Sequence, residues 1–72
     1  MRIITANLNG IRSAASKGFF EWAGLQDADV IGVQEVKAQD EQVKGIHCHI
    51  GKMAGQFHYA QKRGYSGVGI YM

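Results

Sequence analysis

Two short polar segments of this chain carry side chains that could do chemistry. Residues 7–12 (NLNGIR) place two carboxamides before a turn dipeptide and an arginine after it, and residues 33–37 (VQEVK) place a carboxylate after an apolar run. Magnesium takes oxygen ligands, of which usually only one or two are protein carboxylates. A carboxylate beside carboxamides at strand ends is therefore a candidate site for a hard cation, although a single carboxylate is a weak signal.

The same residues also have ordinary structural explanations. Asn7 and Asn9 are typical of strand ends and turns, where side-chain amides satisfy backbone groups. An isolated Glu35 is typical of a solvated or paired surface acid. Without further information, the local pattern favours a structural role for all three residues.

The elements that must position these side chains are a strand, a helix and a second strand. Residues 2–9 begin with a β-branched run and stop at an Asn-Gly dipeptide, which predicts a short buried strand followed by a break. Residues 11–25 carry apolar side chains at three- and four-residue steps, which predicts an amphipathic helix that Gly18 weakens. Residues 30–33 are an apolar run typical of a second buried strand. This order is typical of a layered α/β domain, in which functional groups gather at strand ends that face a crevice.

The rest of the chain is less regular. Residues 38–43 have helical propensity, and residues 44–55, which glycines interrupt, predict a loop. Residues 57–60 and 68–72 alternate well enough to predict two strands around a glycine-containing turn at 61–67.

The last predicted strand would present an unusual surface. Val68, Ile70 and Met72 would form one apolar face with nothing following in sequence to cover it, so we expect the chain to be truncated. The glycines within residues 64–69 lack the lysine and hydroxyl of a phosphate loop. They predict turns and close packing instead.

The length and composition of the chain limit the size of its core and the classes of protein to which it can belong. A chain of 72 residues buries only about 60% of its unfolded surface, and its single cysteine, Cys48, cannot form an internal disulfide. No window approaches the roughly 18 consecutive apolar residues of a membrane span, so we expect no membrane partner. A lone cysteine and a start that quickly turns polar favour the cytoplasm.

Charge is distributed unevenly along the chain. The net charge is only +2, yet every acidic residue lies at or before Glu41, which leaves Lys44, Lys52, Lys62 and Arg63 unopposed. This asymmetry suits an anionic partner such as nucleic acid. Four basic residues over that length are more often simply a solvated face, so charge alone decides little.

The run His47-Cys48-His49 invites interpretation as a zinc site. A closed structural zinc site needs four ligands, and His58 is the one further histidine in the sequence. A surface loop is therefore the expected structure there.

Three segments together resemble a known family. Residues 6–14 (ANLNGIRSA), 29–37 (DVIGVQEVK) and 63–69 (RGYSGVG) resemble, in order and spacing, the first three motifs of the exonuclease III-like apurinic/apyrimidinic endonucleases. The wider superfamily also includes deoxyribonuclease I-like nucleases, sphingomyelinases and inositol phosphatases. Arg12 and the Gly-Tyr-Ser-Gly run favour the DNA-repair branch.

The resemblance implies a fold and a set of site residues. Residues 1–72 would be the amino-terminal portion of a single endonuclease/exonuclease/phosphatase-type domain, an α/β four-layered sandwich of two packed β-sheets flanked by helices. Glu35 would bind the catalytic Mg²⁺, with Mn²⁺ as the alternative ion, and Asn7 would help to order the metal. The residues implied along the DNA-binding face are Arg12, Lys17, Lys37, Gly64, Tyr65 and Ser66, of which Lys37 is expected near the metal and Tyr65 has turn packing as an alternative role.

The activity implied is DNA repair in duplex DNA that contains abasic sites. The enzyme would hydrolyse the phosphodiester 5′ to the abasic site, leave a 3′-hydroxyl and trim 3′ ends. The family's later tyrosine, its aspartate with a nearby asparagine and its aspartate-histidine pair have no counterpart in this sequence, so we expect the chain alone to be inactive. The alternative is a non-catalytic fragment that binds DNA weakly or assembles with a missing remainder. Asn9 stands where some relatives carry aspartate.

Overall fold

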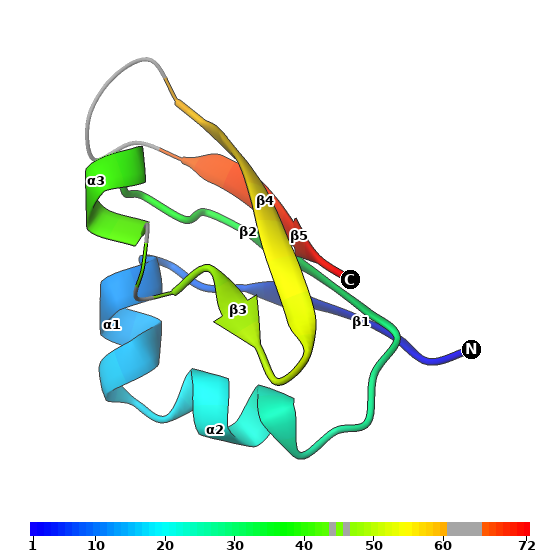
Figure 1. The fold of residues 1–72 in the computed structure, drawn as a ribbon. Helices are drawn as coiled ribbons and strands as arrows, with labels where there is room; N and C mark the ends of the chain where they lie inside the picture. The colour runs from blue at the N-terminus through cyan, green and yellow to red at the C-terminus, as the bar shows by residue number, and fades with distance from the viewer. Residues whose placement is uncertain (44, 46, 61–65) are drawn as a thin grey trace.

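The chain folds as helices packed on one face of a mixed β-sheet (Figure 1). The structure, a computed structural model, describes residues 1–43, 45, 47–60 and 66–72. Its elements in chain order are β1 (Ile3–Asn7), α1 (Ile11–Ser16), α2 (Phe19–Gly24), β2 (Val30–Gln34), α3 (Asp40–Val43), β3 (His49–Ile50), β4 (Met53–Tyr59) and β5 (Gly67–Tyr71). No helix in these described ranges is long and apolar enough to cross a membrane.

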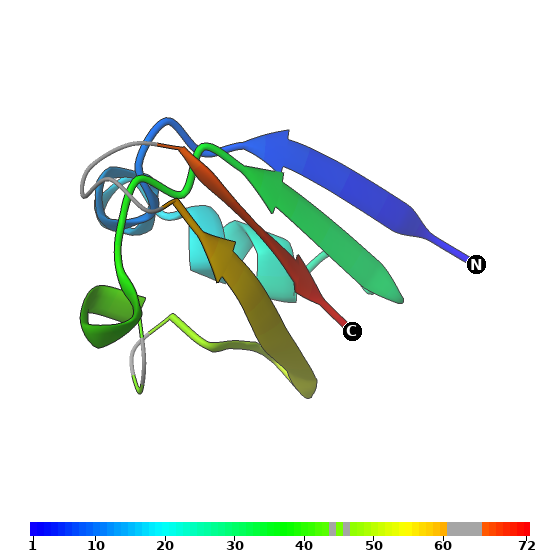
Figure 2. The same cartoon turned by 90° about the horizontal axis from the view of Figure 1, so that it is seen from above.

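The sheet has the strand order β1-β2-β5-β4-β3. β1 and β2 run parallel, and their register extends from Ile3 opposite Val30 to Asn7 opposite Gln34. The other neighbouring strands pair antiparallel. Helices α1 and α2 connect the two parallel strands across one face of the sheet (Figures 1 and 2). The predicted strand, helix and strand unit is therefore confirmed.

The helical segment differs from its prediction. The single helix expected over residues 11–25 is broken into α1 and α2, and Gly18 caps the second with a φ of 92°. A left-handed residue cannot continue a right-handed helix, and glycine adopts that conformation without a Cβ penalty. The break turns α2 so that Ala23 is buried beneath β3, while Trp22 stays half exposed.

The strands also depart from the sequence-based expectation. β1 was expected to be buried, but Ile3 is 61% exposed because β1 is an edge strand, and the sheet is covered on one face. Residues 44–55, expected to be a loop, contain β3 and the start of β4, which begins at Met53 rather than Phe57. A two-residue strand such as β3 has no readable period, so its pairing depends on the neighbouring strand.

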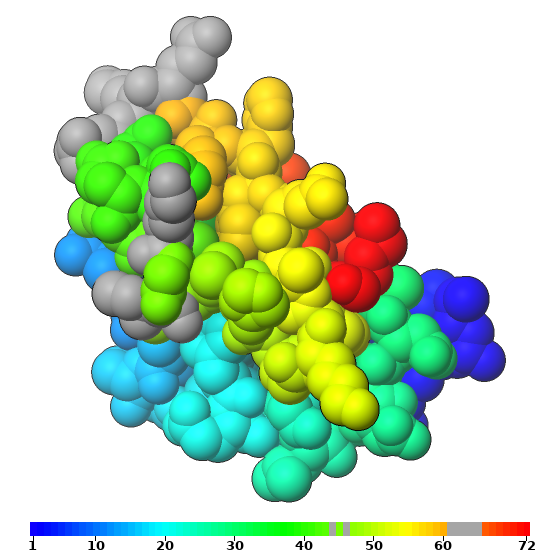
Figure 3. Space-filling view, in the orientation of Figure 1, coloured from blue at the N-terminus to red at the C-terminus, as the bar shows by residue number. Residues whose placement is uncertain are grey.

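The core lies between the helices and the covered face of the sheet. Figure 3 shows the α1–α2 segment, in blue and cyan, packed against the yellow-green β3–β4 segment on that side. Tyr71 is fully buried at its centre, where its ring meets Phe57 edge-on with centroids 5.5 Å apart and its hydroxyl donates a 2.6 Å hydrogen bond to the His47 carbonyl. The buried apolar residues are Leu8, Ile11, Ala23, Ile31, Val33, Val36, Ala38, Val43, Ile50 and Tyr71.

The opposite face of the sheet carries a group of exposed apolar side chains. Val68, Ile70 and Met72 are 50%, 38% and 63% exposed, and the strand register places Ile3 on the same face. The prediction that the side chains of residues 68, 70 and 72 form an apolar face without a cover holds for the residues that the structure describes. We refer to this surface as the open face.

Two glycines on the covered face make room for aromatic rings. A Cβ added at Gly69 would lie 2.5 Å from Phe57 Cε2, and one added at Gly55 would lie 2.7 Å from Tyr71 Cε1. Gly69 therefore serves close packing, as its sequence context predicts. Gly67, at the start of β5, has a φ of 117°, a backbone conformation that residues with a Cβ rarely adopt.

The glycine at position 69 should be difficult to replace. We expect Gly69→Ala to lower the free energy of unfolding by about 1–3 kcal/mol, because the added methyl displaces the ring of Phe57. The matched control is Gly24→Ala in α2, where nothing lies within 4 Å of the new Cβ, and it should be neutral or stabilising by up to about 1 kcal/mol. Urea unfolding of both variants measures the difference, and equal effects would contradict the packing argument.

Candidate functional site

Two of the predicted site residues meet at the carboxyl ends of the parallel strands. Asn7 is the last residue of β1, and Glu35 directly follows β2. Because β1 and β2 are parallel and in register, these ends lie at the same edge of the sheet. The Asn7 amide Nδ2 donates a 2.8 Å hydrogen bond to Glu35 Oε2. The structure therefore brings Asn7 and Glu35 into direct contact.

Asn9 and Lys37 complete a hydrogen-bonded group with these two residues. The backbone N–H of Asn9 donates to Asn7 Oδ1 at 3.0 Å, and Lys37 Nζ donates to Asn9 Oδ1 at 2.6 Å. Lys37 Nζ also lies 3.7 Å from Glu35 Oε1, and the two side chains are 39% and 41% exposed. We refer to Asn7, Asn9, Glu35 and Lys37 as the polar cluster.

Three members of the polar cluster have an uncommon backbone conformation. Asn9, Glu35 and Lys37 have φ values of 48°, 51° and 53°, which lie in the left-handed region. That region costs a non-glycine residue roughly 1–2 kcal/mol, and asparagine less than the others. Between Glu35 and Lys37, Val36 is fully buried in the core. The alternation turns both charged side chains outward while the backbone stays anchored by an apolar residue.

Backbone hydrogen bonds hold this strained segment on both sides. On the side of the β1–α1 turn, the carbonyl of Glu35 accepts from Gly10 N at 2.8 Å and the carbonyl of Val36 accepts from Ile11 N at 2.9 Å. On the side of β5, Val36 N donates to the Gly67 carbonyl and Lys37 N donates to the Ser66 carbonyl, at 3.1 and 3.2 Å. Such bonds over-determine the conformation, which is how strain persists at functional sites.

The predicted DNA-contacting residues lie around this cluster or outside the described residues. Arg12 is exposed in the first turn of α1, directly after the turn that binds Glu35. Lys17 is exposed where α1 ends. Ser66 is exposed and holds the backbone of Lys37 through its carbonyl. Two further predicted residues, Gly64 and Tyr65, fall outside the described ranges.

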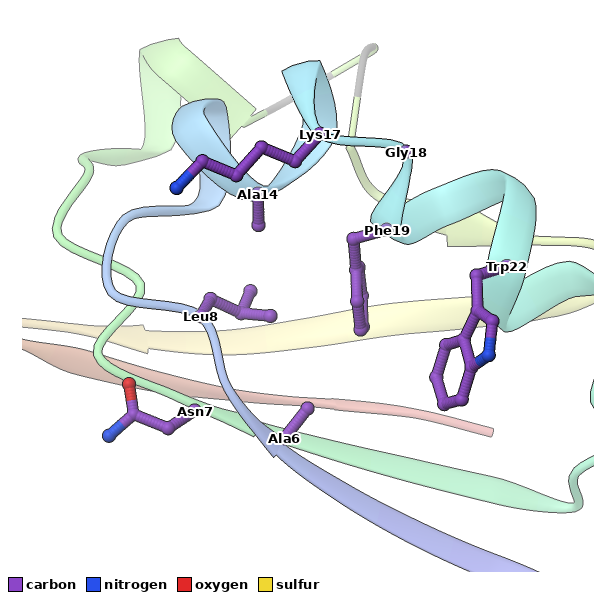
Figure 4. A pocket seen from close by; sticks show the side chains of 8 residues that line it. All are labelled: Ala6, Asn7, Leu8, Ala14, Lys17, Gly18, Phe19 and Trp22. Atoms are coloured by element: carbon purple, nitrogen blue, oxygen red, sulfur yellow. The ribbon is translucent and has the colours of Figure 1, made fainter.

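A cavity of about 420 Å³ opens between β1 and the two helices (Figure 4). Its walls are mostly apolar, with Asn7 and Lys17 toward one end and Trp22 toward the other (Figure 4). Asn7 therefore borders both the cavity and the polar cluster. The lining residues are Ala6, Asn7, Leu8, Ala14, Lys17, Gly18, Phe19 and Trp22.

The histidine-rich segment makes other contacts. The His47 ring stacks on Phe20 with centroids 5.0 Å apart, and its partial burial lowers the pKa of the imidazole. The Sγ of Cys48 lies 3.2 Å from His49 Nδ1. Within the described ranges, no three or more His, Cys, Asp or Glu side chains gather in a way that could hold a metal ion. The zinc interpretation therefore gains no support from these contacts.

The polar cluster fits a hard divalent cation in its chemistry. Glu35 offers a half-exposed carboxylate, and Asn7 adds a carboxamide at hydrogen-bond distance. Both side chains are accessible to water. Magnesium is usually held by one or two carboxylates together with water. The contact between Lys37 and Asn9 was not predicted from the sequence. The only sequence signal for it is that both residues follow strand ends, and these ends become neighbours only in the fold.

Comparisons with known proteins agree on one family. Residues 4–72 match the Endonuclease/Exonuclease/phosphatase family. The chain is 36% identical over 76 residues to an exodeoxyribonuclease of Bacillus subtilis, covering 99% of the chain and 27% of that protein. It is 33% identical to a DNA-(apurinic or apyrimidinic site) endonuclease of Dictyostelium discoideum, covering 97% of the chain and 19% of that protein.

Solved structures of similar proteins agree with this family assignment. The catalytic domain of APE2 from Xenopus laevis superposes with a TM-score of 0.80 at 30% identity, over 99% of this chain and 23% of that one. The AP endonuclease LMAP from Leishmania major superposes with a TM-score of 0.74 at 31% identity, over 97% of this chain and 23% of that one. The predicted family and fold class are confirmed, and the chain spans a minor part of each relative's length.

The strained backbone of the polar cluster gives a prediction about stability. Lys37→Gly should unfold with a free energy about 1 kcal/mol higher than Lys37→Ala, because both variants lose the ammonium and only glycine tolerates a φ of 53°. At Glu21 within α2 the order should reverse, with alanine more stable than glycine by about 1 kcal/mol. Chemical denaturation of the four variants tests this, and alanine exceeding glycine at both positions would refute the strain.

Proposed function

Because this chain belongs to the endonuclease/exonuclease/phosphatase family, we propose that it forms the metal-anchoring part of a DNA-repair nuclease that hydrolyses the phosphodiester 5′ to abasic sites in duplex DNA. The contact between Asn7 and Glu35 at the paired ends of β1 and β2 is the observation that carries the proposal. Two relatives named as an exodeoxyribonuclease and an apurinic or apyrimidinic site endonuclease support the substrate class. Trimming of 3′ ends belongs to the same proposal.

The polar cluster is proposed to hold Mg²⁺, with Mn²⁺ as the alternative. Glu35 would be the charged ligand, and the Asn7 amide would orient it by the hydrogen bond to Oε2. When bound, the ion supplies Lewis-acid stabilisation of charge on the phosphoryl oxygens. The residues of this chain contribute the anchor and its orientation, because strand ends fixed by a backbone ladder hold both side chains in place.

Cationic and polar groups beside the cluster are proposed to hold the DNA backbone. Arg12 and Lys17 are exposed on α1 and just beyond it, and Ser66 lies on the other side of Lys37. Such groups bind phosphate oxygens through charge and hydrogen bonds without reading the base sequence. Gly64 and Tyr65 are proposed to contribute to the same face on the strength of the sequence resemblance.

The chain is proposed to be the amino-terminal portion of one larger catalytic domain. The open face of the sheet supports this, because an apolar sheet surface of this kind is normally packed against a second layer. The polar cluster is proposed to supply one charged metal ligand, and among the described residues no three or more His, Cys, Asp or Glu side chains gather into a metal site. The rival proposal is a non-catalytic chain that binds DNA weakly or assembles with other protein.

The role of Glu35 can be tested by removing its charge. In the intact protein, Glu35→Gln should lower incision of an abasic duplex at fixed Mg²⁺ by at least about 100-fold, and part of the loss should return at higher Mg²⁺ because occupancy is reduced. Glu21→Gln, an exposed acid on α2, serves as the control and should leave incision unchanged. Near-normal turnover of Glu35→Gln with an unchanged Mg²⁺ dependence would remove Glu35 from the site.

The isolated 72-residue chain tests whether its own residues are sufficient for incision. We expect it to bind duplex DNA weakly and without sequence preference, and to show no Mg²⁺-dependent incision above background. Arg12→Ala should reduce the magnitude of the negative slope of log affinity against log salt by about 0.9, as loss of one phosphate contact requires. The control is Lys52→Ala, in the turn between β3 and β4 at the far end of the sheet (Figure 1), which should leave the slope unchanged.

Two results would contradict this expectation. Incision by the pure chain would show that its own residues form a complete catalytic set. A salt slope of the Arg12→Ala variant equal to that of the unaltered chain would show that Arg12 does not contact a DNA phosphate.

A further inference from the structure

The ammonium of Lys37 lies between two oxygen acceptors of unequal charge. It donates to the neutral amide oxygen of Asn9 at 2.6 Å and stands 3.7 Å from the Glu35 carboxylate. The closer partner is therefore the uncharged one. Lys37 is held beside the proposed metal ligand while its own positive charge is only loosely paired.

Both oxygens of the Glu35 carboxylate already face a positively polarised group. Oε2 accepts the 2.8 Å hydrogen bond from Asn7, and Oε1 faces the Lys37 ammonium. A divalent cation that binds Glu35 must either share Oε1 with the Lys37 ammonium, which is also positively charged, or displace that ammonium. Like charges at such a distance repel, and partial exposure of both groups reduces the repulsion without removing it.

The position of the lysine side chain makes a limited displacement feasible. An ion pair between groups that are 39% and 41% exposed is weak, so moving the ammonium away from Glu35 costs little. Asn9 Oδ1 remains available as an anchor after that movement. The strained but braced backbone at position 37 fixes where the lysine stem begins.

We propose that Lys37 is a tethered counter-ion that competes with the divalent metal at Glu35, and that Asn9 sets the strength of that competition. In the metal-free protein the ammonium balances the carboxylate and keeps the polar cluster assembled. Asn9 holds Lys37 in place without neutralising it, so the competing charge stays at full strength. The inference rests on the proposed metal-binding function and names the residues that regulate affinity at that same site.

The proposal predicts a definite order of metal affinities. Lys37→Met removes the competing charge and should tighten Mn²⁺ binding at least about fivefold at low ionic strength. Lys37→Arg keeps the charge and should stay within about twofold of the unaltered protein. Asn9→Asp neutralises the ammonium and adds an oxygen ligand, so it should also tighten binding at least about fivefold. The gain in Lys37→Met should shrink as salt rises, because screening weakens a charge effect.

The measurement is Mn²⁺ titration followed by water-proton relaxation, in the absence of DNA and with Glu35→Gln as the reference for loss of the site. Thermal unfolding without metal checks each variant, and Lys37→Gln replaces Lys37→Met if the latter does not fold. Unchanged affinity in the uncharged variants, or a gain that is insensitive to salt, would overturn the competition. If the unaltered protein and Glu35→Gln bind Mn²⁺ equally, the metal site itself fails, which is a different outcome from failure of the counter-ion role.

Discussion

The fixed position of residues 35–37 is the constraint on which the rest of the site depends. This segment leaves β2 and is held from one side by backbone N–H groups of the β1–α1 turn and from the other by the carbonyls of Ser66 and Gly67. The fully buried side chain of Val36 anchors it in the core. Three parts of the chain that are distant in sequence therefore meet at one point, and none of them could move without breaking the bonds of another. A polar group held by rigid elements is better placed for chemistry than one on a free loop.

The chemistry of the polar cluster follows from this bracing. Left-handed backbone at Glu35 and Lys37 turns two opposite charges toward the same side of the sheet edge. Asn7 and Asn9 then link these charges through their amides, so each side chain in the cluster has a defined partner. The strain is the cost of aiming these groups, and core packing around Val36 offsets it. The backbone conformation at these positions therefore costs stability while it places the two charges side by side.

The two faces of the sheet differ in how far other parts of the chain cover them. Helices α1 and α2 cover one face, where the absence of a Cβ at Gly55 and Gly69 leaves room for the rings of Phe57 and Tyr71. The other face presents apolar side chains from β1 and β5. This arrangement agrees with the similarity to proteins several times longer, in which this chain corresponds to 19–27% of the length. A chain of this size buries a thin core, and an apolar sheet surface favours packing against further protein.

The amino-acid sequence by itself determined the family, the parallel strand pair and the meeting of Asn7 with Glu35. These depend on local signals, namely two apolar runs, a turn dipeptide and polar residues at strand ends, and parallel strands necessarily bring such ends together. The tertiary structure decided the break of the helix at Gly18, the exposure of β1 and the pairing of Lys37 with Asn9. Each of these depends on which segment lies alongside which, since a residue's burial and its hydrogen-bond partners are properties of neighbours that are remote in sequence. The left-handed turn at Glu35 and Lys37 shows this most clearly, because the bonds that hold it come from segments about 25 residues before and 30 residues after it.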